Sequence, residues 1–451
     1  MKYRKINIKK GMKYVNDNIK DVVKSIELEK NSNNYICEWG TKHKENLPNE
    51  ETNRTDYRRQ RDRILYTGGF RRLQGKTQVI AASKNGDHRT RLTHSLEVEQ
   101  IAVSIADALG LNGDLVSAIA LGHDVGHTPF GHAVERFLNE KLKDKGGFSH
   151  AVQSVRYLKN KGINLSYEVL EGILKHDTDV YAGSYNKEQF DCSEYNPLEP
   201  GSLEAQVVYW ADKLAYLTHD FEDFYTQIYE SVKDPELEEN LKEILANIIT
   251  EDEKSEKIKK DLKNFETRDL IRNVLKNLID ESFKNIIKLK ETKTIIDIKV
   301  IRDETKERIK RYEEKLGINE DKSIKETNKI KKKSYQKGLI INFKEEYVEN
   351  YLKLRDIINE YYLGSPEIER SDAKAEKIVS SLYNDFINNH KILPINIRKK
   401  IDEDKENLER VVADYIASMT DRYAEEVFID LNSIGNHYHC LLYTSPSPRD
   451  A

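Results

Sequence analysis

The hydrophobic positions between residues 98 and 109 are spaced three or four apart, the interval at which side chains share one face of a helix. Gly110 follows them directly and is expected to end this helix as its C-cap. The next segment, Leu115–His123, is apolar almost all round, which predicts a helix buried at the centre of the protein. Pro129 stands where a further helix can begin, and we expect that helix to run to about Leu142.

The rest of the amino-terminal half of the chain also has helical spacing. Helices are predicted at 150–161 and 167–176 and, as one long element, over Leu203–Tyr229. Residues 178–202 are polar and rich in turn-forming residues, which predicts a loop. Upstream, a helix is expected over Tyr57–Tyr66, and the glycine pair that follows it interrupts the helical pattern.

One short segment has the pattern of a strand. Residues 76–80 read KTQVI, with alternating and β-branched side chains, and Asn85–Gly86 would supply the turn of a small β-hairpin. Residues 1–50 are polar and rich in asparagine, and we expect one helix followed by a loop there. Together these elements predict an all-α fold: a helical core with a small β-hairpin element and helical insertions.

These changes in pattern divide the chain into five parts. Lysine and glutamate dominate 230–345 at helical spacing, which indicates a set of surface helices. Within this region, residues 322–337 are basic. A solvated loop or frayed helix would explain this stretch, and so would a contact with nucleotide or nucleic acid. The last residues break with the composition of the rest and hold two of the nine prolines. The expected parts are a polar segment at 1–50, the catalytic core at 51–229, a charged helical region at 230–345, helices completing the core at 346–436, and a non-native tail at 440–451.

Composition adds limits to the function. Charged residues make up 34% of the chain and hydrophobic residues 38%, with a net charge of −4, so no global charge indicates nucleic-acid or membrane binding. The first residues lack the apolar segment of a signal peptide, and no apolar run reaches the roughly 18 residues that span a membrane. Cys37, Cys192 and Cys440 are far apart in sequence, without disulfide or metal-ligand spacing. A reduced, cytoplasmic location is therefore expected.

Four histidines lie between Arg91 and Glu135, among the apolar helical segments and close to the acids Asp124 and Glu135. Burying so many polar side chains is costly unless they are paired. His123 and Asp124 are adjacent and point about 100° apart on a helix, so they need ligands from other helices to enclose a metal ion. His94 lies on the buried face of its helix and is one such candidate. A histidine in that position is also explained as a hydrogen-bonded core residue.

Asp212 is the second candidate from elsewhere in the chain. It lies in an otherwise apolar helical segment, with Val208 and Tyr216 on its face, and a carboxylate in such a place is rarely left unpaired. Two imidazoles and two carboxylates suit Mn, Mg, Fe, Co or Ni better than a thiolate-type zinc site. Spare coordination positions could hold water and a phosphate oxygen.

His132 and Glu135 lie three residues apart and can share a helix face near its N-terminus. A carboxylate bonded to an imidazole fixes its tautomer and raises its basicity, so the pair is interpreted as an oriented general acid/base. A partly exposed surface pair is the alternative. His127, His150 and Lys175 are further candidates, and a core role explains the two histidines equally well.

Two basic residues lie close in sequence to the candidate metal ligands. Arg91 lies about one turn before the first histidine and Lys213 follows Asp212 directly; phosphoryl transfer needs such positive charge around the phosphate oxygens. Asp212, Tyr216 and Asp220 fall at intervals of four, a polar stripe suited to line a pocket for metal, phosphate and sugar. The sequence contains no Walker-type loop, no GxGxxG after a strand and no serine or cysteine nucleophile signature.

The arrangement H…HD…D, here His94, His123–Asp124 and Asp212, resembles the motif of the HD-domain metal phosphohydrolases. Six blocks, in order over about residues 54–424, resemble more closely the deoxyguanosine triphosphate triphosphohydrolase (dGTPase-like) family: RDRILYTGGFRRLQGKTQV, TRLTHSLEV, HDVGHTPFGHAVE, GGFSH, SLEAQVVYWADKLAYLTHDFED and DYIASMTDRYA. The chain departs from the family's pattern at YWADKLAY, at Ala151 and throughout 230–345, but no departure removes a ligand.

This resemblance implies an all-helical fold and hydrolysis of a deoxynucleoside triphosphate, dGTP or a broader set, to deoxynucleoside and inorganic triphosphate with a divalent metal ion. The implied metal ligands are His94, His123, Asp124 and Asp212. The implied catalytic residues are His132, Glu135, His127 and His150. The implied substrate contacts are Arg91, Lys213, Tyr216, Asp220 and Gln74.

Two other functions stay open from the residues. Another HD phosphohydrolase, such as a 5′-nucleotidase, is the alternative enzyme; the absence of HDxxED and GYP motifs argues against (p)ppGpp and cyclic-dinucleotide hydrolases. A nucleotide-sensing or nucleic-acid-binding HD protein without turnover is the alternative of another class. The resemblance also implies a homo-oligomer with a nucleotide activator or single-stranded DNA as partners, and no membrane. It leaves open the base preference and the native metal.

Overall fold

Most of the residues that the structure describes are helical. The computed structural model describes residues 55–78, 89–177, 181, 185–232, 234–249, 252–293, 298–318 and 323–432. Those residues contain helices and no β-sheet, which confirms the predicted all-α class. The expectations for 1–50, for the turn at 85–86 and for the tail at 440–451 lie outside the described residues.

The predicted β-hairpin is not supported by the part of the chain that the structure describes. A single antiparallel bridge joins Thr77 to Thr90 there, and the Arg91 amide donates to the Lys76 carbonyl beside it at 2.9 Å. The Thr90 side chain also caps the helix that follows. The bridge therefore fixes the residue at which that helix begins.

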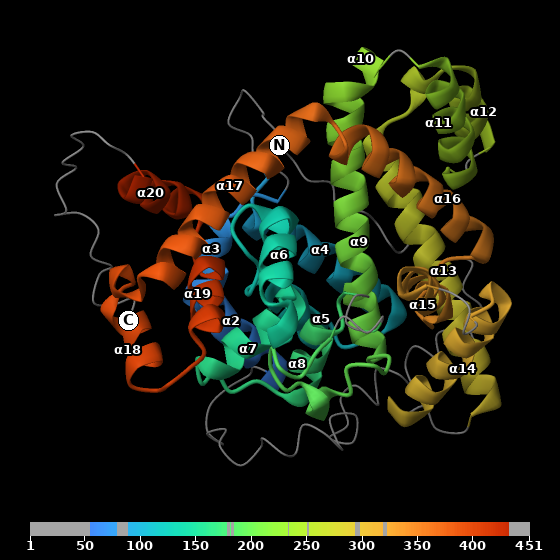
Figure 1. The fold of residues 1–451 in the computed structure, drawn as a ribbon. Coiled ribbons are helices and arrows are strands. Elements are labelled where there is room, and N and C mark those ends of the chain that lie inside the picture. Colours follow the sequence, from blue (N-terminus) through green and yellow to red (C-terminus); the bar gives the residue numbers. More distant parts are fainter. Residues whose placement is uncertain are drawn as a thin grey trace.

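Four helices form the centre of the molecule. Helix α4 (Arg91–Leu109) packs against α5 (Gly113–Gly122) and against α9 (Leu203–Asp223), and α2 (Asp56–Leu65) packs on α5. Their apolar faces form one buried cluster, which includes Val98, Ile105, Ile119 and Val208. Helix α9 stands upright at the middle of Figure 1, with the amino-terminal helices on one side and helices of the 230–345 region on the other.

Most predicted helix boundaries agree with the structure. Helix α4 ends at Gly110, whose φ of +69° is a left-handed conformation that glycine adopts without strain. Helix α9 continues through a π-helical turn, Phe224–Ile228, into α10 (Tyr229–Val232), so the predicted long element is one continuous rod. The remaining helices of this half are α3 (Gly68–Arg72), α7 (His150–Asn160) and α8 (Tyr167–Leu174).

Helix α6 (Gly131–Lys141) begins two residues later than predicted from Pro129. Phe130 holds a left-handed backbone with φ of 55°, which interrupts the helix at that point. Its amide donates to the Asp421 carboxylate at 2.8 Å. A contact from almost three hundred residues away thus holds the turn between α5 and α6, and local sequence patterns carry no sign of it.

Gly126 lies in this turn, where the chain touches α7. A β-carbon there would lie 2.3 Å from the Ser154 amide nitrogen, a backbone atom that cannot move aside. We expect Gly126→Ala to lower the free energy of unfolding by about 1–3 kcal/mol in denaturant titrations, because overpacking forces the backbone apart. Gly113→Ala is the control, since its β-carbon would meet nothing nearer than 3.4 Å; equal stability of the two variants would contradict this prediction.

The prediction of surface helices over 230–345 is wrong for part of that region. It forms α11 (Pro235–Ile248), α12 (Asp252–Lys260), α13 (Thr267–Thr292), α14 (Ile298–Leu316) and α15 (Ile324–Gly338). Helix α13 packs on α4 and α9 and buries Leu270, Val274 and Leu278 in the main core. These residues are four apart and lie between lysines and glutamates, so the average composition hides the apolar stripe.

The segment after α15 completes the main core. The Trp210 indole donates to the Ile341 carbonyl at 2.7 Å, and the Gln206 side-chain oxygen accepts from the Ile340 amide at 2.9 Å. The basic stretch 322–337 falls mostly on α15, whose start is capped by Ser323. Residues 324–337 therefore form a helix and not a loop.

A second, smaller core joins the carboxyl-terminal helices to α6. These helices are α17 (Pro366–Asn388), α18 (Ile395–Asp402), α19 (Leu408–Ala417) and α20 (Asp421–Asn432), whereas α16 (Glu345–Ile357) packs in the main core. Val134 and Leu138 of α6 pack there with Leu382 and Ile416. The buried Lys76 ammonium, at the bridge beside α4, donates to the Ala417 carbonyl at 2.8 Å and to the His127 carbonyl. In the described residues, none of the helices is long and apolar enough to span a membrane.

Candidate metal centre and active site

Three helices bring the predicted metal ligands together. His94 lies on α4, His123 and Asp124 directly follow α5, and Asp212 lies in the middle of α9. The Asp212 Oδ1 atom is 2.9 Å from His94 Nε2 and 3.7 Å from His123 Nε2. His123 Nε2 is 3.6 Å from Asp124 Oδ2. Two imidazoles and two carboxylates therefore face one point.

The state of His123 fits a metal ligand. Its Nδ1 donates to the Ala120 carbonyl at 2.6 Å, so the lone pair lies on Nε2. That Nε2 atom is buried and has no hydrogen-bond partner in the described part of the protein. A buried lone pair without a partner is costly, and a metal ion would satisfy it. Nitrogen and carboxylate oxygen together suit a divalent transition metal or magnesium.

Both carboxylates are held in their ionised form. Burial alone would raise the pKa of Asp124, but the Arg91 guanidinium and His123 hold it well below its usual range. Burial alone would also raise the pKa of Asp212, but a hydrogen bond from His94 and the nearby His123 lower it. Ionised carboxylates are the form that binds cations.

Arg91 lies where the resemblance implies a phosphate contact. Its Nη1 atom donates to Asp124 Oδ2 at 2.7 Å, and both side chains are buried. Its Nε and Nη2 atoms have no hydrogen-bond partner among the described residues. A buried guanidinium with unused donors beside a metal site is suited to bind a phosphate oxygen.

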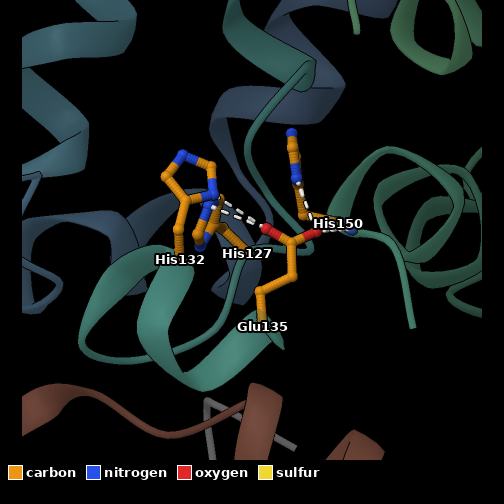
Figure 2. Close-up of side chains that lie close together, drawn as sticks. All are labelled: His127, His132, Glu135 and His150. Atoms are coloured by element: carbon orange, nitrogen blue, oxygen red, sulfur yellow. Dashed lines mark hydrogen bonds and ion pairs between the residues drawn. The ribbon is translucent and has the colours of Figure 1, made fainter. Parts of the chain in front are cut away.

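Glu135 connects three histidines on the other side of the centre. Figure 2 shows His132 and His127 at one carboxylate oxygen and His150 at the other. His132 Nδ1 is 2.9 Å from Glu135 Oε2 and His150 Nδ1 is 2.8 Å from Oε1. His127 Nε2 is farther away, 3.8 Å from Oε2. The His132 side chain is 52% exposed, so it can meet a substrate.

Electrostatics give these histidines different protonation states. Burial alone would lower the pKa of His150, but the Glu135 and Asp124 carboxylates raise it to about 9. Burial and Arg91 hold the pKa of His127 well below its usual range, which leaves it neutral. Burial alone would raise the pKa of Glu135, but His150 and His132 lower it, so its carboxylate stays charged.

A cavity of about 180 Å³ joins the metal donors to these groups. The predicted residues that line it are Arg91, His94, Asp124, His132, His150, Asp212, Lys213 and Tyr216. Lys213 also lies over the Tyr209 ring, 4.1 Å from its centre. The cavity is therefore lined by cations, by metal donors and by the exposed His132.

Three predicted residues lie elsewhere. Gln74 is exposed and does not line the cavity. Asp220 is buried and hydrogen-bonded to Tyr216; burial raises its pKa to about 8. Lys175 is turned to a separate buried ion pair, with its Nζ 2.6 Å from Glu171.

Sequence reasoning missed several lining residues, of which His176 and Asp177 matter most. They follow α8 directly, and His176 Nε2 lies 2.9 Å from His150 Nε2. Their signal was a second His–Asp pair at the end of an apolar helix, as at His123. The other lining residues that were missed are Gln78, Tyr351 and Arg355, which have no comparable local signal.

Comparison with known proteins agrees with this geometry. The HD domain model matches residues 91–217 and the phosphohydrolase-associated domain model matches 341–429. A Rickettsia bellii protein is 36% identical over 393 residues, covering 84% of this chain and 92% of the relative. Proteins of Rickettsia felis and Rickettsia prowazekii are 35% identical over 397 residues, with the same coverage.

All three relatives are named deoxyguanosinetriphosphate triphosphohydrolase-like protein. The two domain models fall on the parts of the chain that form the metal centre and the carboxyl-terminal helices. A metal-dependent phosphohydrolase is consistent with both the comparisons and the donor set. The chain belongs to the deoxyguanosinetriphosphate triphosphohydrolase-like family of HD-domain proteins.

Proposed function

We propose that the protein hydrolyses deoxynucleoside triphosphates to deoxynucleoside and inorganic triphosphate. The observation that carries this proposal is a single cavity lined by metal donors, by Arg91 and Lys213, and by the exposed His132. Metal, cations and a proton-transfer group are the parts that attack on a phosphate ester requires. The names of the relatives support a deoxynucleotide as the substrate.

The metal centre and Arg91 would act on the α-phosphate. A divalent ion held by His94, His123, Asp124 and Asp212 would polarise a phosphate oxygen when bound. Arg91 would donate its unused Nη2 hydrogens to a non-bridging oxygen, where charge grows during the reaction. Lys213 stands across the same cavity and would neutralise the triphosphate that leaves.

His132 would act as the general acid or base that transfers the proton. Its Nδ1 faces Glu135, so the Nε2 atom is directed away from the carboxylate and toward the substrate.

 The bond that breaks in the proposed reaction is the one between the α-phosphorus and the sugar 5′-oxygen. The water oxygen stays on the α-phosphorus, so all three phosphorus atoms leave together as triphosphate, and a proton passes to the 5′-oxygen to give the deoxynucleoside. His132, oriented by Glu135, would take the proton of the attacking water or supply that of the 5′-oxygen. Tyr216, which lines the cavity and is hydrogen-bonded to the buried Asp220, would face the sugar.

The product identifies this reaction. We expect the pure protein, supplied with Mn²⁺ or Mg²⁺ and each deoxynucleoside triphosphate in turn, to release inorganic triphosphate and deoxynucleoside, resolved by anion-exchange chromatography. The panel also reports the base preference, and adding a second deoxynucleotide to each reaction tests activation. Asp124→Asn protein is the control for a contaminating phosphatase.

Other products would contradict the proposal. Release of pyrophosphate or orthophosphate in place of triphosphate would reject the reaction. Hydrolysis confined to deoxynucleoside monophosphates would favour a 5′-nucleotidase. Metal binding with no hydrolysis of any nucleotide would favour a sensing protein without turnover.

A further inference from the structure

The turn between α5 and α6, residues 123–130, decides where the His132 side chain points. His132 is the second residue of α6, so the start of that helix fixes its direction. Phe130 and Gly131 have φ of 55° and 64°, and two successive left-handed residues turn the chain sharply just before His132. A residue with a side chain disfavours this conformation, so Phe130 keeps it only where surrounding contacts hold it.

The carboxylate of Asp421 provides one such contact. Asp421 is the first residue of α20, and its Oδ1 atom accepts from the Phe130 amide at 2.8 Å. Its Oδ2 atom accepts from the Thr77 amide at 2.9 Å and also from the Thr77 hydroxyl. One side chain therefore fastens the turn to the segment that pairs with the start of α4, the helix that carries His94.

The other end of the turn is held by the buried Lys76. Its ammonium donates to the His127 carbonyl and, at 2.8 Å, to the carbonyl of Ala417, the last residue of α19. Residues 76–77 and 417–421 are thus bonded to each other and to opposite ends of the same turn. The carboxyl-terminal helices therefore reach the active site through the backbone of this turn.

Contacts within the turn do not replace the one from Asp421. The Thr128 hydroxyl donates to the Gly131 carbonyl at 2.8 Å, and the Phe130 ring is buried in the second core. Neither contact bonds the Phe130 amide, which stands at the helix start, where amides lack a partner within the helix. Removing the carboxylate would leave this donor without its acceptor, which is costly for a buried group.

We propose that Asp421 positions His132 for proton transfer by holding the left-handed turn at which α6 begins. This inference rests on the proposed function, in which His132 transfers the proton. Glu135 lies on the same helix and contacts both His132 and His150, so a shift in the start of α6 would move the whole group relative to the metal donors. Asp421 is outside the cavity and is therefore a positioning residue.

A double-mutant cycle tests whether Asp421 acts through His132. We expect Asp421→Ala protein to retain its metal by elemental analysis and to lose about 10²-fold in kcat with little change in KM, because a displacement of about 1 Å has an effect of this size. In a His132→Ala background the same substitution should lower kcat by less than about threefold, since residues that act as a unit are not additive. Equal factors in both backgrounds, or wild-type kcat in Asp421→Ala protein, would overturn the proposal.

Three further variants separate positioning from a general loss of stability. Thr77→Val removes only the hydroxyl contact and leaves the carboxylate at the Phe130 amide, so it should keep the wild-type kcat. Leu393→Ala opens a space in the second core and should lower the melting temperature without lowering kcat at a temperature well below it. An equal fall in kcat in Leu393→Ala protein would overturn the proposal. Asp421→Asn retains one acceptor oxygen and should lose less kcat than Asp421→Ala, which provides a test if the alanine variant fails to fold.

Hydrogen–deuterium exchange gives a readout that needs no substrate. The Phe130 amide is bonded to Asp421, so the peptide covering residues 124–135 is expected to exchange faster in Asp421→Ala protein than in wild-type or Thr77→Val protein. Unchanged exchange would overturn the proposed hold on the turn, whatever the protein hydrolyses. Faster exchange in a protein that releases no triphosphate would reject the proposed function and keep the hold on the turn, so the two failures are distinguishable.

Discussion

Asp124→Asn protein is expected to lose its bound metal and its hydrolytic activity together. Asp124 lies against His123 and Arg91 at the centre of the site, and the neutral amide removes the charge that binds the cation. If the ion supplies about 4 kcal/mol of transition-state stabilisation, the rate falls by about 10³-fold. Elemental analysis of the purified variant and triphosphate release under saturating substrate measure the two losses.

Folding has to be checked in the same variant. The substitution leaves the buried Arg91 guanidinium beside a neutral group, which destabilises the folded state, so circular dichroism on heating accompanies the assay. Asp303→Asn is the matched control, since Asp303 is exposed on α14; it should keep both metal and rate. A folded Asp124→Asn protein with its full metal content would show that the centre has been misidentified.

His132→Ala protein is expected to keep its metal and lose most of its rate. The His132 side chain is half exposed and bonded to Glu135, not to the metal donors, so its removal spares the centre. Loss of a general acid/base lowers the rate by about 10²–10⁴-fold. The decrease should appear in kcat more than in KM, because His132 acts on the proton and adds little to substrate binding.

A surface histidine provides the comparison for that measurement. His390 is paired with Asp402 outside the cavity, and His390→Ala should retain the wild-type kcat. Elemental analysis distinguishes a catalytic defect from loss of the ion. Full activity in folded His132→Ala protein would remove the proposed proton-transfer role, and loss of metal in that variant would place His132 among the ligands.

The local pattern of hydrophobic residues and glycines was sufficient to predict most of the helices. Helix α5 was predicted because Leu115–His123 is apolar on nearly every side, and it is buried in the structure. Helix α4 was predicted to end at Gly110 because a left-handed C-cap favours glycine. Both signals arise within a few residues of one another, where sequence spacing and spatial distance are directly related.

The predictions failed where contacts between distant parts of the chain determine where a helix begins or which of its residues are buried. Asp421 binds the Phe130 amide, which moves the start of α6 beyond Pro129. Helix α13 is covered by lysine and glutamate along its outer side, yet Val274 is buried against the main core. The start of α6 has no local signal, because it depends on a residue far away in the chain; the apolar stripe of α13 was a local signal, but the lysines and glutamates around it hid it in the average composition.

The sequence by itself determined which residue types are available for chemistry: an HD pair ending an apolar helix, a histidine one turn after Arg91, and a carboxylate in an apolar segment at Asp212. It also indicated the family, through motifs whose spacing is local. Only the tertiary structure decided that His94 and Asp212 meet at 2.9 Å, that Gln74 lies outside the cavity, and that His176 faces His150. Helical periodicity sets the direction of a side chain around its own axis, whereas the meeting of two side chains depends on how whole helices pack.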